Sequence, residues 1–372
     1  MRYIVCIMLV WIAAPLVGWN LGDQEISSAS EWVPIQVASE LSRYSDGVQL
    51  SKVKHSFEAI TKAMHGDAAP IAHVHFSNGA CTWDLPEKIN PIFVKRMHIF
   101  GQAIELLHTH DPVPNTEFLL SLDHCCERPL YLHQLEVPIF CVSRSSRNDQ
   151  VVLIPRGVFQ KDREAFFEDI QSAQLPWDDR AQKLVWRLLT FERHDIHYDW
   201  RLGPTVPLFY LGDKNPDILD IGVPEKCLRS IHSQYRGAIA NDQMKRLDLP
   251  PLDYLKYRYL LTFDQRSSPQ TLEWQLFSGS VILKAETTGD AFKKVFAEWY
   301  SSKLQPYVHF VPIPGELRDI IDHVNWCINH DAECQQIAQN AADFAREMLT
   351  DVQVFKYFNQ VLKEYTKLCQ PK

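Results

Sequence analysis

Short apolar runs alternate along the chain with amphipathic stretches of helical spacing. Two runs, 72–76 and 81–83, flank the tripeptide Ser77-Asn78-Gly79, which is typical of a tight hairpin turn. Apolar residues then recur every three or four positions, as on one face of a helix, at Phe93, Met97, Phe100, Ile104 and Leu107. The pattern therefore predicts a β-hairpin followed by a long helix.

The alternation continues to the end of the chain. Strands are predicted where short apolar runs are bounded by polar or turn residues, at 117–122, 137–142, 151–155, 183–189, 257–263, 280–284 and 308–312. Helices are predicted at 162–173, 269–277, 291–304, 332–349 and 352–368. Strands separated by helices favour parallel sheets covered on both faces, so the expected fold class is α/β. Ligands of such sheets bind at the carboxyl ends of the strands.

The length of 372 residues exceeds the size at which a single core stops growing, so we expect two lobes. The periodic pattern is lost around 194–207, which favours a crossing between lobes there. This divides the chain into an N-terminal lobe at 20–200, a C-terminal lobe at 201–350 and a closing helix at 351–372.

The N-terminus has the pattern of an export signal. Arg2 precedes a nearly unbroken apolar run from position 3 to 19, which is short for a membrane span and suits a signal peptide. A retained membrane anchor and a buried first helix stay open as alternatives for 1–19. A signal peptide or an anchor would direct the protein to a secretory lumen or a bacterial envelope.

Charge and metal-ligand spacing exclude some classes of function. A formal net charge of −8 argues against nucleic acid as the main partner. The cysteines contain no pair of C-x-x-C elements, which argues against structural zinc. His73-x-His75 and His108-x-His110-Asp111 supply histidines, but two ligands do not make a site, and we expect these histidines to be solvated or hydrogen-bonded. No Asp-x-Asp occurs, so no metal is expected.

Two places carry candidate chemistry. In the run from Asp264 to Pro269, Ser268 can cap a helix that has Pro269 at its first position, and Arg266 adds a cation. Such a turn can bind phosphate; the alternative is an ordinary capped helix. Asp123 ends a predicted buried strand and is the candidate general base for an attacking hydroxyl. Its alternative role is to cap the following turn.

Several segments resemble glycosyltransferase family 90, the family of fungal capsule xylosyltransferases and animal protein O-glucosyltransferases. The similarity lies in 256–261 with Asp264, in 276–284, in Glu298-Trp299-Tyr300 and in 304–312. Further similar segments are 137–140 with Ser143, 176–187, 215–220, His330-Asp331 and 337–345. The order and spacing of these segments extend the resemblance from about residue 70 to the C-terminus.

The resemblance implies two facing Rossmann-like lobes of the GT-B type, with the C-terminal helix packing back towards the first lobe. It implies an inverting transfer of glucose or xylose from a UDP-sugar to a hydroxyl of a protein or glycan, with no metal or other cofactor. The first lobe would then be the acceptor side and the second would bind the nucleotide sugar. Asp123 would be the base, Arg266, Ser267 and Ser268 would contact the diphosphate, and Ser143, Arg187 and Arg201 would be further donor contacts.

The sequence also departs from the family pattern. Leu188 stands where the family commonly has glycine after Trp-Arg, and Gln265 and Thr271 stand where many members have glycine and the arginine that contacts the diphosphate. Arg266 is a possible replacement for that arginine, and Thr271 occupies its place in the donor site. The departures keep a second hypothesis open, a weakened pseudo-enzyme or a glycan-binding protein of the same fold.

Overall fold

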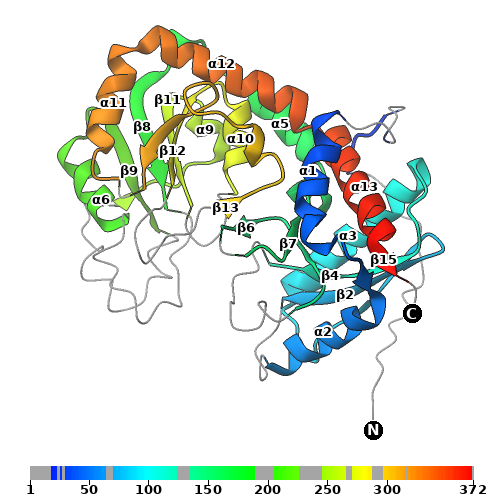
Figure 1. Cartoon of the computed structure of the whole chain (residues 1–372). Coiled ribbons are helices and arrows are strands. Elements are labelled where there is room, and N and C mark those ends of the chain that lie inside the picture. Colours follow the sequence, from blue (N-terminus) through cyan, green and yellow to red (C-terminus); the bar gives the residue numbers. More distant parts are fainter. Residues whose placement is uncertain are drawn as a thin grey trace.

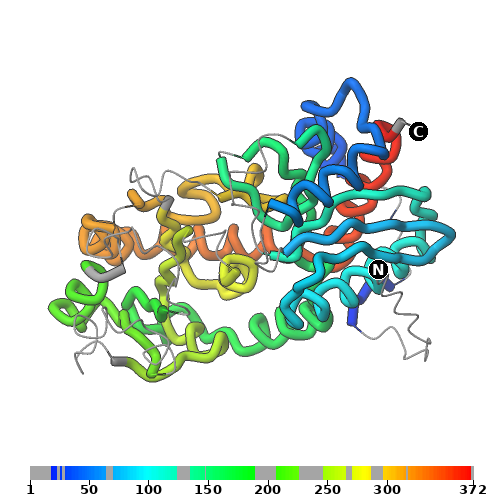
Figure 2. Tube along the Cα trace, turned by 90° about the horizontal axis from the view of Figure 1, so that it is seen from below, coloured from blue at the N-terminus to red at the C-terminus, as the bar shows by residue number. Residues whose placement is uncertain are grey.

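Two β-sheets, each packed against helices, form the body of the protein in a computed structural model (Figures 1 and 2). The structure describes residues 18–22, 26, 30–63, 70–123, 135–146, 148–188, 205–225, 245–264, 270–286, 296–315 and 317–370. No helix within these ranges is long and apolar enough to cross a membrane. Most of the predicted export segment, 1–17, lies outside them.

The first sheet has the strand order β3-β2-β4-β5-β7. Its strands are β2 (Ile71–Ser77), β3 (Ala80–Asp84), β4 (Thr116–Ser121), β5 (Ile139–Cys141) and β7 (Val151–Leu153). The pairs β2–β3 and β2–β4 are antiparallel, whereas β4–β5 and β5–β7 are parallel. Asn78 and Gly79 have φ values of 52° and 78°, as a type I′ hairpin turn requires. The predicted hairpin is therefore confirmed.

Helices cover the first sheet. They are α1 (Trp32–Leu41), α2 (Leu50–Ala63) and α3 (Pro91–His110), together with α13 (Asp351–Leu368) from the far end of the chain. Asn90 caps α3 through a side-chain bond to the Ile92 N–H, and Pro91 occupies the first position of the helix, both common at helix starts. The sequence predicted α3 and α13, but α1 and α2 carried no prediction.

The second sheet is parallel throughout, in the order β10-β9-β8-β11-β12-β14. Its strands are β8 (Ala181–Arg187), β9 (Leu219–Pro224), β10 (Lys245–Arg246), β11 (Tyr257–Phe263), β12 (Val281–Glu286) and β14 (Val311–Pro314). The helices α6 (Thr205–Lys214), α11 (Ile320–Asn329) and α12 (Asp331–Met348) contribute buried residues to one face, and α5 (Arg163–Ser172), α9 (Pro251–Tyr254) and α10 (Leu272–Phe277) to the other. The expected α/β class with two sheet-based lobes is confirmed.

The last helix returns to the first lobe, as predicted. Helix α12 ends near the junction of the lobes, and α13 lies beside α1 (Figure 1). Phe358 of α13 contacts Phe100 of α3 with ring centroids 5.5 Å apart. The Tyr365 hydroxyl donates to the Glu117 carbonyl oxygen of β4 at 2.9 Å. These contacts anchor the C-terminus of the chain on the first sheet.

The structure corrects the predicted crossing between lobes. Strand β8, expected in the lobe at 20–200, pairs with β9 and β11 in the second sheet. The chain therefore enters the second sheet at Ala181. The loss of periodicity around 194–207, which suggested the later crossing, falls largely outside the described residues. Apolar spacing shows that a strand exists but not which sheet it joins, because that depends on partners distant in sequence.

Two further predictions are corrected between residues 291 and 314. The predicted helix at 291–304 is wrong over its described part, where β13 (Phe296–Ala297) and the 3₁₀ turn η7 (Ser301–Lys303) occur. Phe296 pairs with another strand, and Trp299 and Tyr300 are completely buried, so tertiary packing overrides the local spacing. The strand predicted at 308–312 begins later, as β14 at Val311.

Candidate active site

Connections that leave the carboxyl ends of the two sheets pair with each other. The short strand β6 (Arg144–Ser145) follows β5 of the first sheet, and it is antiparallel to β13, which follows β12 of the second. Asp264, directly after β11, is completely buried and accepts a hydrogen bond from the Phe296 N–H at 3.0 Å. The carboxyl ends of the two sheets therefore adjoin, as a site that joins an acceptor lobe to a donor lobe requires.

Asp123 lies two residues beyond β4 on this side of the first sheet and is partly exposed. The Arg96 guanidinium of α3 donates to the Leu122 carbonyl oxygen at 2.6 Å. Burial and the nearby charge of Arg156 lower the pKa of Arg96, while the charge of Asp123 acts in the opposite direction. Asp123 is thus a carboxylate close to solvent and to positive charge, whereas its neighbour His124 lies outside the described residues.

Ser143 and Arg156 follow the next two strands of the same sheet. Ser143 is buried just after β5, and its backbone N–H donates to the Cys141 thiol, whose pKa burial nevertheless raises. Arg156 opens the 3₁₀ turn η2 (Arg156–Phe159) after β7 and is buried. Because β4, β5 and β7 are parallel neighbours, Asp123, Ser143 and Arg156 all lie at the carboxyl end of the sheet.

Arg156 also connects the first lobe to the second. Its Nη2 atom lies 2.6 Å from Oε1 of Glu298, which follows β13, and both side chains are almost completely buried. Burial acts to lower the pKa of Arg156, but Glu298 more than compensates and the pKa is raised. The positive charge of Arg156 is therefore held beside the carboxyl end of the first sheet at any ordinary pH.

The predicted diphosphate turn begins where β11 ends, at the carboxyl end of the second sheet. Arg266, Ser267 and Ser268 lie outside the described residues, as does Arg201. Helix α10 begins at Leu272 with Thr271 as its N-cap residue, so Ser268 is not the N-cap that the sequence predicted. The helix begins with its buried residues, Leu272 and Glu273. A serine-proline pair permits a helix start but does not require one.

Arg187 makes its contacts within the second lobe. Its Nη2 atom lies 2.9 Å from Asp220 Oδ1, Nη1 donates to the Asp220 carbonyl oxygen at 2.7 Å, and Nε donates to the Leu247 carbonyl oxygen at 3.1 Å. Burial acts to raise the pKa of Asp220, but hydrogen bonds from Arg187 and Tyr257 lower it. The structure thus gives Arg187, proposed above as a donor contact, the task of joining β8 to β9 and the segment after β10.

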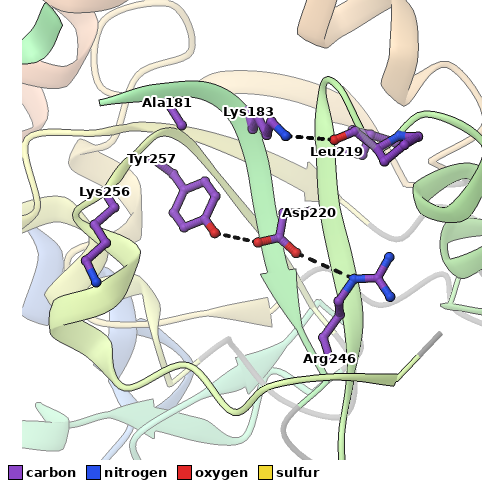
Figure 3. Close-up of a pocket in the computed structure, with 8 residues that line it drawn as sticks. Ala181, Lys183, Leu219, Asp220, Arg246, Lys256 and Tyr257 are labelled. Atoms are coloured by element: carbon purple, nitrogen blue, oxygen red, sulfur yellow. Dashed lines mark hydrogen bonds and ion pairs between the residues drawn. The ribbon is translucent and has the colours of Figure 1, made fainter. Parts of the chain in front are cut away.

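A surface cavity of about 350 Å³ lies beside Asp220, whose carboxylate faces Tyr257 and Arg246 (Figure 3). The first residues of β8, β9 and β11 line it, together with Asp220 and three basic side chains, Lys183, Arg246 and Lys256. Burial, reinforced by the Asp220 carboxylate, raises the pKa of Tyr257 in its wall to about 12. The cavity contains the amino ends of three strands, whereas ligands of open α/β sheets bind at the carboxyl ends. We therefore do not assign the sugar donor to it.

The structure brings together Asp123 and Ser143 at the carboxyl end of the first sheet. The guanidinium of Arg187 contacts Asp220 and Leu247 instead. Arg156 was missed by the sequence analysis, although it follows a predicted strand directly, as Asp123 does. Glu298 was noted only as part of a Glu-Trp-Tyr motif, without a role. Its partner is 142 positions away, and no local pattern reveals such a pair.

Comparison with protein families gives one match in the second half of the chain. Residues 218–372 match the model described as "Glycosyl transferase family 90". The chain is 22% identical over 272 residues to Protein O-glucosyltransferase 1 of Homo sapiens, covering 68% of this chain and 63% of that protein. It is 29% identical over 116 residues to Protein O-glucosyltransferase 2 of Danio rerio, covering 31% and 22%. An uncharacterized protein, 035R, of Invertebrate iridescent virus 3 is 28% identical over 197 residues, with coverage of 51% and 17%.

The chain spans less than two thirds of the length of each of these relatives. Among solved structures, it resembles HepE of Anabaena in complex with UDP-glucose, with 12% identity, a TM-score of 0.34 and coverage of 55% of this chain and 52% of that one. It also resembles a glycosyltransferase from Rickettsia africae, with 11% identity, a TM-score of 0.36 and coverage of 64% and 66%.

Proposed function

Because residues 218–372 match the model of glycosyltransferase family 90, we propose that the chain is a member of this family and transfers a sugar from a UDP-sugar to a hydroxyl group of a protein or glycan. The observation that carries the proposal is the position of Asp123, a partly exposed carboxylate on the side where the carboxyl ends of the two sheets adjoin. A hydroxyl that attacks an anomeric carbon must lose its proton as the new bond forms, and a carboxylate within hydrogen-bond reach can accept it.

The proposed reaction is a single displacement with inversion. The acceptor oxygen bonds to the anomeric carbon on the face opposite the leaving group, and the bond from that carbon to the diphosphate oxygen breaks. The hydroxyl proton moves to Asp123, and UDP leaves with the bonding electron pair. Preorganised positive charge stabilises such a leaving group. We propose Arg266, Ser267 and Ser268 for this task, with Thr271 as a further donor contact.

The first sheet has a second source of positive charge at its carboxyl end. Arg156 is held there by Glu298, and Arg96 lies close enough to Asp123 for their charges to interact. These cations lie at the same end of the sheet as Asp123 and can stabilise negative charge that develops there during transfer. Together with the absence of an Asp-x-Asp motif, this supports our proposal that transfer proceeds without a bound metal.

The direct test is to incubate the purified chain with UDP-glucose and UDP-xylose and to measure UDP release with and without protein and glycan acceptors. We expect acceptor-dependent release from one of these donors, undiminished by a chelator. Thr271 stands where many family members have the arginine that contacts the diphosphate. This difference motivates the second candidate, a glycan-binding protein without activity. Calorimetry with UDP separates the two, because absence of both nucleotide binding and transfer would support the second and overturn the first.

We also propose that the protein acts in a secretory lumen or a bacterial envelope, because its first 19 residues have the composition of an export signal. N-terminal sequencing of the mature protein distinguishes a cleaved signal from a retained anchor. An intact N-terminus in a protein recovered from the cytosol would contradict export.

A further inference from the structure

The edge of the first sheet carries a cluster of histidines and carboxylates that the transfer reaction does not use. His73 and His75 are two residues apart on β2, so their side chains share one face of the sheet. His75 is paired in register with Glu117 of β4, and His73 with Asp84 of β3. Strand pairing therefore places both imidazoles between two carboxylates.

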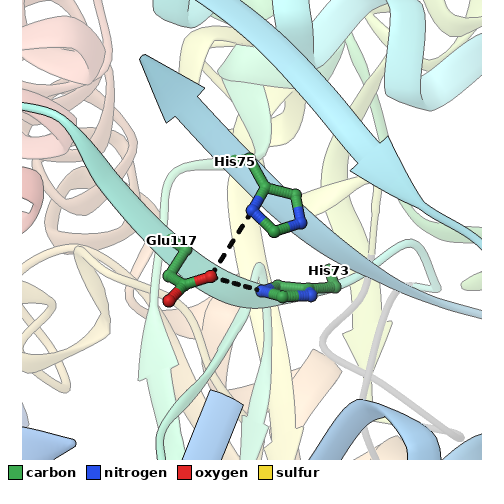
Figure 4. Close-up of side chains that lie close together, drawn as sticks. All are labelled: His73, His75 and Glu117. Atoms are coloured by element: carbon green, nitrogen blue, oxygen red, sulfur yellow. Dashed lines mark hydrogen bonds and ion pairs between the residues drawn. The ribbon is translucent and has the colours of Figure 1, made fainter. Parts of the chain in front are cut away.

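The contacts divide the four ring nitrogens into two pairs. Asp84 Oδ2 lies 3.1 Å from His73 Nδ1 and 3.1 Å from His75 Nε2. Glu117 Oε2 lies 3.1 Å from His73 Nε2 and 3.4 Å from His75 Nδ1 (Figure 4). Each ring thus faces Asp84 with one nitrogen and Glu117 with the other.

This arrangement has a consequence for protons. A neutral imidazole carries one N–H and one lone pair. If each ring donates its N–H to Asp84, the lone pairs of His73 Nε2 and His75 Nδ1 both point towards the Glu117 carboxylate. Three acceptor atoms then converge with no hydrogen between them, and a cation at their centre removes the repulsion.

We propose that His73 Nε2, His75 Nδ1 and Glu117 Oε2 bind one zinc ion, while Asp84 orients both rings through their other N–H groups. The atoms that these three residues can offer lie within 4.8 Å of one another. Zinc bonds of about 2.0–2.1 Å in a tetrahedron place ligand atoms about 3.3 Å apart, close to the observed 3.1 and 3.4 Å. A carboxylate that accepts the second N–H of a metal-binding histidine is a common supporting contact.

Solvent can supply the ion and a fourth ligand. His73 is fully buried, but the side chains of His75 and Asp84 are 34% and 51% exposed. The site therefore has a buried side and an open side, as three protein ligands with one water require. Imidazole with carboxylate suits zinc better than magnesium or calcium, which prefer ligand sets made of oxygen alone.

The proposed ion is remote from the proposed reaction. Glu117 is the second residue of β4 and Asp123 lies two residues beyond its end, and an extended chain of six residues spans about 20 Å. The ion would join β2 to β4 and, through Asp84, hold β3 in place. Zinc here is a clamp on the edge of the sheet and takes no part in sugar transfer.

The test is zinc binding to the purified full chain after treatment with a chelator and dialysis. Calorimetry at neutral pH is expected to show one Zn²⁺ ion bound per chain and no heat from Mg²⁺, and Zn²⁺ should raise the melting temperature. His75→Gln and Glu117→Gln are each expected to weaken binding at least tenfold. His110→Gln removes another exposed histidine of the same lobe and should bind Zn²⁺ as the parent chain does.

A second measurement keeps the proposal testable if a variant does not fold. Co²⁺ added to the parent chain should give the visible absorption of a tetrahedral site, and excess Zn²⁺ should abolish it. No saturable Zn²⁺ binding by the parent chain would overturn the proposal and leave a shared proton as the group that joins His73, His75 and Glu117. Wild-type affinity in a folded His75→Gln variant would overturn it as well.

Discussion

Asp123 combines exposure with nearby positive charge. It follows the buried strand β4, it is partly open to solvent, and its charge acts on Arg96. A carboxylate that is open to solvent can be reached by a bound hydroxyl and can accept its proton. Asp123 can act as the general base without a second carboxylate beside it.

We expect Asp123→Asn to reduce the rate of transfer by about 10²- to 10⁴-fold, the usual contribution of a general base. The affinity for UDP and the melting temperature should stay close to those of the parent chain, because the amide keeps the shape of the side chain. Steady-state kinetics with the preferred donor measures the effect. Asp169→Asn, at an exposed position of α5, is the matched control, and a fully active Asp123→Asn variant would refute the assignment.

Arg187 presents the opposite case, because its side chain is 4% exposed and its guanidinium is engaged with Asp220 and Leu247. Lysine keeps the charge of arginine but cannot make three directed contacts from one planar group. We expect Arg187→Lys to lower the free energy of unfolding by at least about 2 kcal/mol, as measured by urea denaturation. Lys183→Gln, on the same strand, should cost less than about 1 kcal/mol, because it removes one exposed hydrogen bond.

The same variant separates two roles for Arg187. If it serves the second lobe only, the folded Arg187→Lys protein should bind UDP with nearly unchanged affinity. A large loss of UDP affinity without a loss of stability would restore Arg187 as a donor contact.

At the scale of elements, β13 and the residues after it hold the two lobes together. β13 pairs with β6, Asp264 fixes its first N–H, and Glu298 reaches Arg156 in the first lobe. A second buried ion-paired cluster lies nearby, where Arg163 of α5 meets Asp351 at 3.0 Å and Glu273 of α10 at 3.4 Å. Both arginines follow the first sheet, and each binds an acid from the second half of the chain.

We expect Glu298→Gln to lower the free energy of unfolding by about 3–5 kcal/mol, because it removes the carboxylate charge that lies against the buried guanidinium of Arg156. Chemical denaturation measures this loss. The double variant Arg156→Met with Glu298→Met should be less destabilised than Glu298→Gln, since it buries no uncompensated charge. Glu364→Gln breaks the exposed pair with Lys367 and should change stability by less than about 1 kcal/mol. Equal losses in both glutamine variants would contradict this account.

At the scale of the molecule, one hydrophobic cluster extends through both lobes. It contains Phe118 and Phe140 from the first sheet and also Val185, Leu260 and Ile282 from the second. Their neighbours along the same strands belong to a separate cluster on the other face, with α6, α11 and the first half of α12. One face of the second sheet and the first sheet are therefore packed into the same hydrophobic core.

We expect heat to unfold the chain in a single cooperative transition, because the shared cluster leaves no apolar boundary between the lobes. Phe358→Ala in the first lobe and Leu283→Ala on the far face of the second sheet should both lower this one transition temperature, each costing about 2–5 kcal/mol. Scanning calorimetry measures the number of transitions. Two separate transitions, with each variant shifting a different one, would show that the lobes unfold independently.

Local pattern determined the hairpin at Asn78-Gly79, the helices α3, α5, α12 and α13, and most of the strands. These elements are set by neighbouring residues, through turn chemistry and the spacing of apolar positions. The same reasoning placed Asp123 and Asp264 at the ends of strands, since a polar residue after a buried run marks such an end. It failed at 291–304, where burial of Trp299 and Tyr300 and the pairing of β13 with β6 decided the structure.

The sequence by itself therefore determined the α/β class and the resemblance to glycosyltransferase family 90, because both depend on patterns and motifs that are local or occur in a fixed order. Only the tertiary structure decided which sheet β8 joins, that Arg156 binds Glu298, and that Arg187 is engaged by Asp220. It alone brought Glu117 to His73 and His75, from a strand 42 positions further along the chain. The physical reason is the same in each case. The energy of a contact depends on the distance between two residues in space, whereas the amino-acid sequence gives only their separation along the backbone.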